Sequence, residues 1–235
     1  MKKRLIILSI IIIVFLLGSS GLFWISKSRT FQFFGEIYPR IETTQKFVAL
    51  TFDDGPTPEG TDEILKILAA ENVKATFFVI GAEVEKNPGQ LEKIMAAGHE
   101  IGNHTYNHER MILVTPSFVK DEVEKTDALI RKAGYADEIL FRPPFGKKLF
   151  ALPFYLSQNN RKSITWDVEP ETFFEKTDDL VNYTSANTKN GSIILLHVMY
   201  KSRKESMNAV QPIIKLLREK GFEFTTVSAL LKIKN

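Results

Sequence analysis

The hydrophobic and polar positions divide the chain into an apolar N-terminal run and a longer, regularly patterned region. Apolar residues are almost unbroken from Leu5 to Ser26, between a cationic start and the two cations Lys27 and Arg29. A helix of about twenty apolar residues is long enough to span a bilayer. The run therefore predicts a transmembrane helix over residues 1–26.

From residue 45 onward, short β-rich apolar runs alternate with longer stretches of helical periodicity, a pattern typical of parallel βα units. The predicted strands cover residues 47–52, 75–80, 100–102, 139–141, 163–166, 192–196 and 222–225. The predicted helices cover residues 62–71, 91–97, 117–133, 149–159, 178–189 and 207–220, and glycines at 98, 134, 191 and 221 suit helix stops. We therefore predict an α/β fold, a distorted (β/α) barrel of about seven parallel strands.

The leader is open to two interpretations, an uncleaved anchor and a cleaved signal peptide. The small residues at 18–21 would suit a cleavage site. The apolar run resumes at residues 22–25, however, and Trp24 suits a membrane interface. We prefer the anchor, with its cationic start in the cytoplasm and the rest of the chain outside the cell membrane. If the leader is cleaved, the protein is secreted.

The region after the leader is long enough for one folded domain, which we place at residues 45–235. We interpret residues 27–44 as a tether, and its Phe31, Phe33 and Phe34 can pack on the domain. The chain has no cysteine, so the fold rests on its core without disulfides. We expect this domain to be monomeric.

The net charge of +3 invites a nucleic-acid interpretation, but its origin argues against one. Five of the 31 basic residues, and no acidic residue, lie in the first thirty positions. The remaining 26 basic residues face 28 acidic residues, so the domain carries about −2. Nucleic acid is therefore not a supported partner.

Two short motifs carry the chemistry. Asp53 and Asp54 end a predicted strand, and His104 and His108 follow another. If the histidine segment coils, the two imidazoles lie one turn apart and can converge with a carboxylate on one metal ion, which leaves a coordination position open for water. One aspartate can then bind the ion while its neighbour accepts a proton. An Asp-Asp-Gly-Pro stretch alone is usually only a turn, so the case rests on the combination.

These and three further motifs make residues 45–232 resemble the NodB-type polysaccharide deacetylases, carbohydrate esterase family four. The resemblance implies that Asp53 is the general base and that Asp54, His104 and His108 are the metal ligands. In the stretch Arg142-Pro143-Pro144-Phe145-Gly146, Arg142 would orient the base, and the backbone N–H at Phe145 would help to hold the oxyanion. The family more often has Tyr at this aromatic position.

The last two motifs would complete the site. The stretch Leu195-Leu196-His197 implies an acetyl pocket at Leu195 and a general acid at His197. The fourth motif departs from the family pattern, because Thr172 and Phe173 stand where an Asp-Trp pair is usual. The carboxylate that tunes His197 could be Glu169, Glu171 or Asp167. We predict Glu169, which keeps the family's three-residue offset from the pocket residue Trp166.

The sequence therefore predicts a metal-dependent hydrolase that removes N-acetyl groups from an extracytoplasmic glycan, favouring N-acetylglucosamine or related sugars of peptidoglycan. Chitin-type oligosaccharides, an exopolysaccharide, O-acetylated xylan and a small cyclic or linear amide stay open as substrates. A non-catalytic envelope glycan-binding protein is the alternative from another class. Zinc is the favoured ion, and nitrogen and oxygen ligands also suit cobalt or nickel.

Two other groups of polar residues predict no chemistry. His99 lies at the start of a strand, away from the catalytic end, and is interpreted as structural. The anionic run Asp121-Glu122 is interpreted as a solvated helix face.

Overall fold

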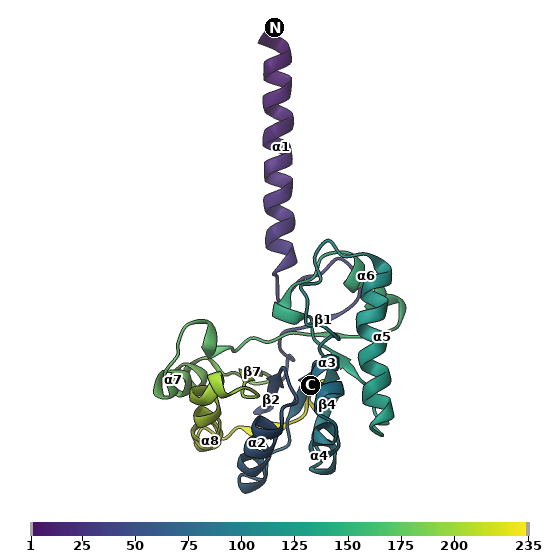
Figure 1. The fold of residues 1–235 in the computed structure, drawn as a ribbon. Coiled ribbons are helices and arrows are strands. Elements are labelled where there is room, and N and C mark those ends of the chain that lie inside the picture. The colour runs from purple at the N-terminus through teal and green to yellow at the C-terminus, as the bar shows by residue number, and fades with distance from the viewer. Residues whose placement is uncertain (1, 234–235) are drawn as a thin grey trace.

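The computed structural model describes residues 2–233, with the side chains of residues 3–233. Helix α1 (Lys2–Ser26) projects away from the remaining domain (Figure 1). Its apolar side chains are largely exposed, and by length and composition the helix could cross a membrane. This agrees with the span predicted from the sequence.

The domain is built on a parallel sheet, as predicted (Figure 1). Its strands are β1 (Ile37–Tyr38), β2 (Phe47–Asp53), β3 (Thr76–Val79), β4 (Glu100–Asn103), β5 (Leu140–Phe141), β6 (Ser163–Ile164), β7 (Ile193–His197) and β8 (Glu223–Thr225). They run in the order β1-β6-β5-β4-β3-β2-β7, and β8 also pairs with β2. Every pairing between these strands is parallel. The predicted α/β barrel architecture is confirmed.

The helices alternate with the strands. They are α2 (Pro58–Ala70), α3 (Gly81–Lys86), α4 (Gln90–Ala96), α5 (Pro116–Lys132), α6 (Ala151–Gln158), α7 (Thr177–Asn187), α8 (Lys204–Glu219) and α9 (Val227–Lys232), with short 3₁₀ turns at Pro144–Gly146, Pro170–Thr172 and Lys201–Arg203. Thr57 and Thr115 begin α2 and α5 by accepting a backbone N–H with their hydroxyls, each followed by a proline in the first turn. The two six-residue helices α3 and α9 were missed because they are too short to show periodicity.

The core lies between the sheet and its covering helices. The central strand β2 is buried at six of its seven positions, which explains its continuous run of apolar residues. Phe52 and Phe77 pack within this core with ring centroids 5.1 Å apart. The buried sheet provides a rigid base from which the loops at the strand ends project.

The predicted tether is folded onto the domain. Its strand β1 pairs in parallel with β6, an element that the sequence did not predict because it is only two residues long. Phe33 stacks on Phe150 with ring centroids 4.7 Å apart, as the apolar content of the segment suggested. Lys148 is 1% exposed, and its backbone N–H donates to the carbonyl of Ser26 at 2.9 Å. The end of α1 is therefore joined directly to the domain.

Candidate active site

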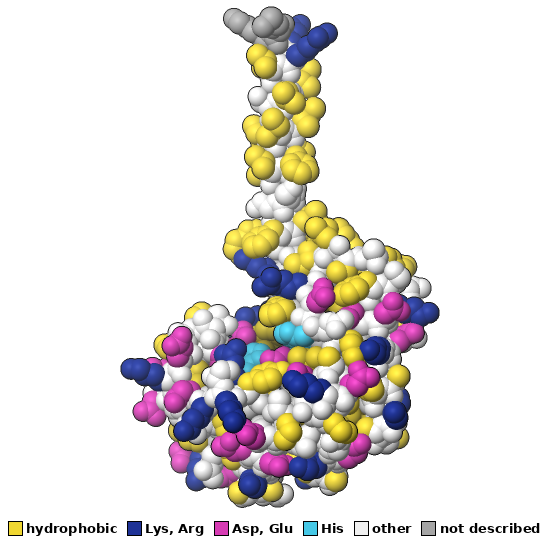
Figure 2. Space-filling view, in the orientation of Figure 1, with side chains coloured by type: hydrophobic (Ala, Val, Ile, Leu, Met, Phe, Trp, Pro, Cys, Tyr) yellow, Lys and Arg dark blue, Asp and Glu magenta, His cyan; other side chains and the backbone are white. Residues whose placement is uncertain are grey.

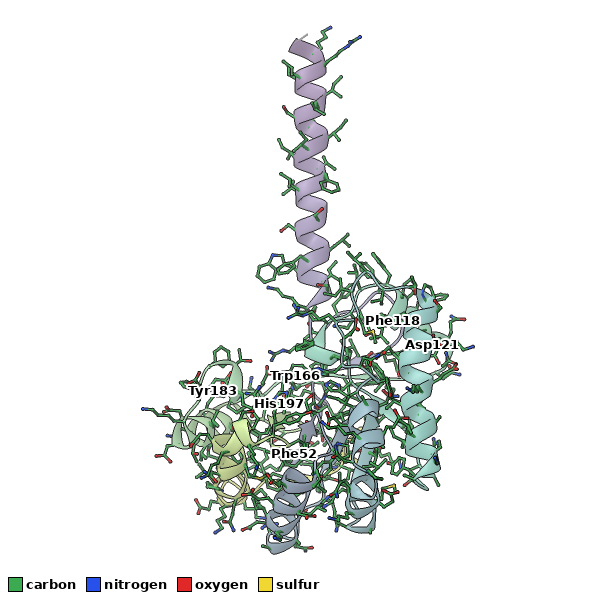
Figure 3. All side chains as sticks on the ribbon, viewed as in Figure 1. Phe52, Phe118, Asp121, Trp166, Tyr183 and His197 are labelled. Atoms are coloured by element: carbon green, nitrogen blue, oxygen red, sulfur yellow. The ribbon has the colours of Figure 1, made fainter. Side chains whose placement is uncertain are left out.

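The C-terminal ends of β2, β4, β5 and β7 bring the predicted motifs together. Asp53 and His197 are register partners on adjacent strands, while His104 and Arg142 directly follow β4 and β5. Asp53, His104 and His197 border a cavity of about 360 Å³, which is also lined by Trp166; Trp166 and His197 are labelled in Figure 3. The cavity is lined by Arg29, Asp53, Asp54, His104, His108, Phe145, Trp166, Glu169, Thr172, Leu195, His197 and Arg203.

Asp53 is held by a buried arginine. The Arg142 guanidinium, which is fully buried, donates from Nη1 to Asp53 Oδ1 at 2.6 Å and to Thr51 Oγ1 at 2.8 Å. Its other nitrogens donate to the carbonyls of Ile164 and Thr165. A charge-assisted hydrogen bond between buried partners fixes the carboxylate strongly. The structure thus places Arg142 where the sequence predicted it, in position to orient Asp53.

Asp54 turns out of the strand toward the two histidines. Its φ of 67° ends the strand geometry, so that both neighbouring carboxylates face one site. The next residue, Gly55, also has a positive φ, and a Cβ there would lie 2.5 Å from Met199 Cγ. Glycine is therefore required both for the turn and for the close approach of Met199.

Asp54, His104 and His108 offer three ligand atoms within 4.8 Å of one another. Asp54 Oδ1 is buried and has no hydrogen-bond partner among the described residues. His104 Nδ1 donates to the Arg142 carbonyl at 2.8 Å, which leaves Nε2 with a free lone pair facing Asp54. Burial lowers the pKa of His104 to about 3 and also lowers the pKa of His108, so both rings are neutral. An orphaned oxygen beside two neutral imidazoles fits a divalent metal ion.

The histidine segment does not coil, and residues outside the predicted motifs hold it. His104 to His108 form a loop with positive φ at Thr105 and His108. Glu122 accepts the backbone N–H groups of Tyr106 at 3.0 Å and of Asn107 at 2.8 Å. The imidazoles converge because this loop is bound to α5, not because they share a helical turn.

The burial of Glu122 corrects our interpretation of Asp121-Glu122 as a solvated helix face. Asp121 is exposed on α5, as Figure 3 shows, but Glu122 is only 4% exposed. Helical periodicity around Val119 and Val123 was the available signal, because it turns Glu122 toward the domain.

His197 is paired with Glu171, so our prediction of Glu169 at this position is wrong. The Nδ1–H of His197 donates to Glu171 Oε2, and its backbone N–H donates to Glu171 Oε1 at 2.9 Å. Burial alone would lower the pKa of His197, but the hydrogen bond and the charge of Glu171 outweigh it and raise the pKa to about 9. The imidazole is therefore protonated at neutral pH. The turn at Pro170–Thr172 presents Glu171 to His197, and sequence offsets could not reveal it.

Glu169 instead joins the pocket wall to the segment that follows α1. Its Oε2 accepts hydrogen bonds from Trp166 Nε1 at 2.9 Å, from Thr172 Oγ1 at 2.7 Å and from Arg29 Nη2 at 2.8 Å. The Arg29 guanidinium also lies 4.8 Å from the centre of the Trp166 ring. Arg29, which the sequence interpretation left in the tether, is therefore part of the cavity.

The remaining predicted residues either line the cavity or make hydrogen bonds in the structure around it. Leu195 and Trp166 are buried and line the cavity. Phe145 has a φ of 57° and lines the cavity, and its ring centroid lies 4.6 Å from that of His108.

Asp167 and His99 do not line the cavity and make structural hydrogen bonds. Asp167 accepts from Ser192 Oγ at 2.8 Å and from the Ile193 N–H at 2.9 Å, while His197 is paired with Glu171. His99 Nδ1 accepts the Ala75 N–H at 3.2 Å, in line with its structural interpretation.

Solved structures show the same fold. The Bc1960 peptidoglycan N-acetylglucosamine deacetylase matches 81% of this chain and 90% of its own, with a TM-score of 0.77 and 34% identity. BA3943 from Bacillus anthracis, described as a family-four pseudoenzyme, matches 84% of this chain and 71% of its own, with a TM-score of 0.76 and 28% identity.

Sequence comparison then defines the family. The sequence model described as polysaccharide deacetylase matches residues 40–164. A peptidoglycan-N-acetylglucosamine deacetylase from Bacillus cereus is 33% identical over 208 residues, covering 86% of this chain and 95% of that protein. A chitooligosaccharide deacetylase from Bradyrhizobium is 33% identical, covering 75% of this chain and 86% of that protein. The chain belongs to the polysaccharide deacetylase family, and the predicted enzyme class, a hydrolase, is confirmed.

Proposed function

We propose that this protein removes N-acetyl groups from N-acetylglucosamine or related sugars of peptidoglycan, in a metal-dependent reaction outside the cell membrane. The proposal is carried by the surroundings of Asp53. Its carboxylate accepts a hydrogen bond from Arg142, and on the adjacent strand its register partner is His197. The three candidate metal ligands, Asp54, His104 and His108, lie beside it. The substrate rests on relatives named as peptidoglycan deacetylases.

The metal would be held by Asp54 Oδ1 and the Nε2 atoms of His104 and His108. Three nitrogen and oxygen ligands with an open side are typical of catalytic zinc sites, and the same ligands also suit cobalt or nickel. When bound, the ion would polarise the acetyl carbonyl and make a nearby water more acidic.

The side chains of the chain supply the remaining steps. Asp53, which Arg142 orients by a 2.6 Å hydrogen bond, accepts a proton from the water that attacks the acetyl carbonyl. The N–H of Phe145 can donate to the developing oxyanion, a type of donor whose loss typically costs about 100- to 1000-fold in rate. His197 then donates its proton to the departing nitrogen, and Leu195 bounds the space for the acetyl methyl group.

We also propose that α1 anchors the enzyme as a single span, with residues 45–235 as the extracytoplasmic catalytic domain. The run of exposed apolar side chains along α1 supports this, because water would solvate it poorly. The cations Lys3 and Arg4 favour a cytoplasmic N-terminus. Cleavage of the leader would give a secreted enzyme of the same activity.

The test is acetate release by the full-length protein in detergent micelles. Purified peptidoglycan, N-acetylglucosamine tetramers and O-acetylated xylan are incubated with the wild type and with Asp53→Asn, with and without a chelator. We expect release from peptidoglycan by the wild type alone, lost with the chelator and restored by zinc. Release from xylan only would overturn the proposed substrate.

The alternative of a non-catalytic glycan-binding protein is tested by the same experiment. It is relevant because a structural neighbour is described as a pseudoenzyme. Retained glycan binding with no acetate from any substrate, at full zinc occupancy, would favour it. The complete set of Asp53, His197 and three metal-ligand candidates supports catalysis instead.

A further inference from the structure

An exposed cluster of aromatic rings lies on the domain near the end of α1, where the Lys148 N–H donates to the Ser26 carbonyl. We call it the aromatic collar; its members are Phe31, Phe33, Phe34, Phe150 and Phe154, each between 37% and 49% exposed. The ring centroids lie 5.6 Å apart in the pair Phe31–Phe33, 4.7 Å apart in Phe33–Phe150 and 5.4 Å apart in Phe34–Phe154. Figure 2 shows hydrophobic side chains gathered on the domain at the base of α1. An exposed apolar patch of this kind usually marks an interaction surface.

The position of the collar identifies its occupant. Residues 5–24 would cover the hydrocarbon thickness of a bilayer, roughly 30 Å at 1.5 Å per residue. Phe23 and Trp24 then lie at the interface, the region where aromatic rings are favoured. Lys27 lies 3.6 Å from the Trp24 ring centre, and Lys147 lies 5.5 Å from the Phe23 ring centre, so cations stand where lipid phosphates would be.

The collar is also fixed relative to α1. Phe31, Phe33 and Phe34 follow α1 within eight residues, Phe150 directly precedes α6, and Phe154 lies in the first turn of α6. The hydrogen bond from the Lys148 N–H to the Ser26 carbonyl ties these two groups to the helix end. We propose that the aromatic collar inserts into the outer interfacial region of the same bilayer that α1 spans. This inference rests on the proposed anchor.

Because the chain has no cysteine, single cysteines can report the depth of each site. A polarity-sensitive dye is attached to full-length Phe33→Cys and, separately, to Phe154→Cys, reconstituted in phosphatidylglycerol and phosphatidylethanolamine vesicles. Quenching is measured with aqueous iodide and with lipids that carry a spin label near the headgroup. Phe173→Cys is the matched control, because Phe173 is 62% exposed and lies 5.1 Å from Tyr183, on the arm away from α1 in Figure 3. Val14→Cys reports whether α1 is in the bilayer.

We expect both collar dyes to be quenched by the spin-labelled lipid and shielded from iodide several-fold more than the dye at position 173. A shielded dye at position 14 with fully exposed collar dyes would overturn the inference while leaving the anchor intact. Exposure at position 14 would refute the anchor and the collar together. Shielding that disappears when the protein is diluted with lipid would identify a second copy of the chain as the occupant, and would also overturn the inference.

A second, independent inference concerns Arg29. Its guanidinium lines the cavity, donates to Glu169 at 2.8 Å and lies over Trp166, while its carbonyl accepts from Thr165 Oγ1 at 2.7 Å. It precedes the matched family region, which begins at residue 40. A guanidinium has five N–H donors, so a pair with one carboxylate oxygen leaves others free to bind sugar oxygens. We infer that Arg29 is a substrate-binding residue for a sugar neighbouring the acetylated one.

This inference rests on the proposed function, and the experiment separates the two. Acetate release from N-acetylglucosamine dimers and tetramers is measured for the wild type, Arg29→Ala and Arg29→Lys. Lys27→Ala is the control, because Lys27 lies on the same segment but does not line the cavity. We expect Arg29→Ala to raise KM several-fold for the tetramer, with less effect on kcat and with partial recovery in Arg29→Lys.

An active wild type with the same KM in Arg29→Ala would overturn the role of Arg29 alone. An inactive wild type would contradict the proposed function instead. In that case calorimetry measures the affinity for the tetramer. Equal affinity in the wild type and in Arg29→Ala refutes the inference about Arg29.

Discussion

The strand-end cluster and the segment at residues 27–44 contribute to the same cavity by different means. Asp53, His104 and Arg142 are each placed by a buried parallel strand, so their positions follow from the sheet itself. Arg29 is placed by contacts with residues about 140 positions away in the sequence. The comparison indicates that rigid elements carry the groups that we propose to react, whereas contacts between distant segments shape the wall of the cavity around them.

The largest expected effect falls on the strand-end cluster. Asp53→Asn should lower kcat by about 100- to 10,000-fold, since general base catalysis contributes that much. Zinc stoichiometry, measured by elemental analysis, should stay near that of the wild type, whereas Asp54→Asn should lose metal. Equal metal loss in the two variants would contradict the division of roles between the adjacent carboxylates.

The next effect concerns a residue that supports the cluster without lining the cavity. Glu122→Gln removes the charge that holds the loop of His104 and His108. Loss of a residue that orients metal ligands typically weakens metal affinity about 10- to 100-fold. Competition with a zinc-binding dye measures this, with the exposed neighbour Asp121→Asn as control. An unchanged affinity in Glu122→Gln would show that the loop holds its shape without this carboxylate.

A smaller and more selective effect is expected at His197. Because the acid must be protonated, the alkaline limb of the pH–rate profile reports its pKa, which Glu171 raises to about 9. Glu171→Gln removes that charge and should move the alkaline limb to lower pH by about 1 to 3 units. Glu169→Gln, whose carboxylate contacts Arg29 and Trp166, should leave the limb in place. A shift in Glu169→Gln alone would reverse this assignment.

The smallest effect belongs to the segment at residues 27–44. Phe33→Ala removes a ring stacked on Phe150 and should lower the free energy of unfolding by about 1 kcal/mol. Chemical denaturation of the full-length protein in detergent measures this, with Leu113→Ala as an exposed control. Zinc binding should not change. A loss of zinc in Phe33→Ala would mean that the two regions are coupled more closely than their contacts indicate.

The sequence predicted the parts of the molecule that depend on local pattern. The strands that end at Asp53 and His197 are long apolar runs, so their identity and the positions of the motif residues could be read directly. The helices with clear periodicity were found to within a few residues at each end. The prediction that Asp54, His104 and His108 come together likewise rested on residue types that suit one metal ion, and the structure brings their ligand atoms within 4.8 Å of one another.

The parts that failed depend on tertiary contacts. Glu169 and Glu171 are two residues apart in a short turn, and only the path of that turn decides which one meets His197. The two-residue strand β1 carries too little pattern to be recognised. Arg29 gave no signal as a pocket residue, because its partners lie far away in the sequence. Such residues become visible only when the chain is folded.

The joint between Lys148 and the end of α1 has a consequence for how the enzyme meets its substrate. The carbonyls of Ser26 and Ser28 accept hydrogen bonds from the buried Lys148. These bonds hold the end of α1 against the domain and so restrict the distance between the last turn of the helix and the cavity. With α1 in a bilayer, the search for substrate becomes lateral diffusion in a plane. Such an enzyme would modify glycan strands while they are still close to the membrane, and its output would scale with membrane area instead of wall thickness.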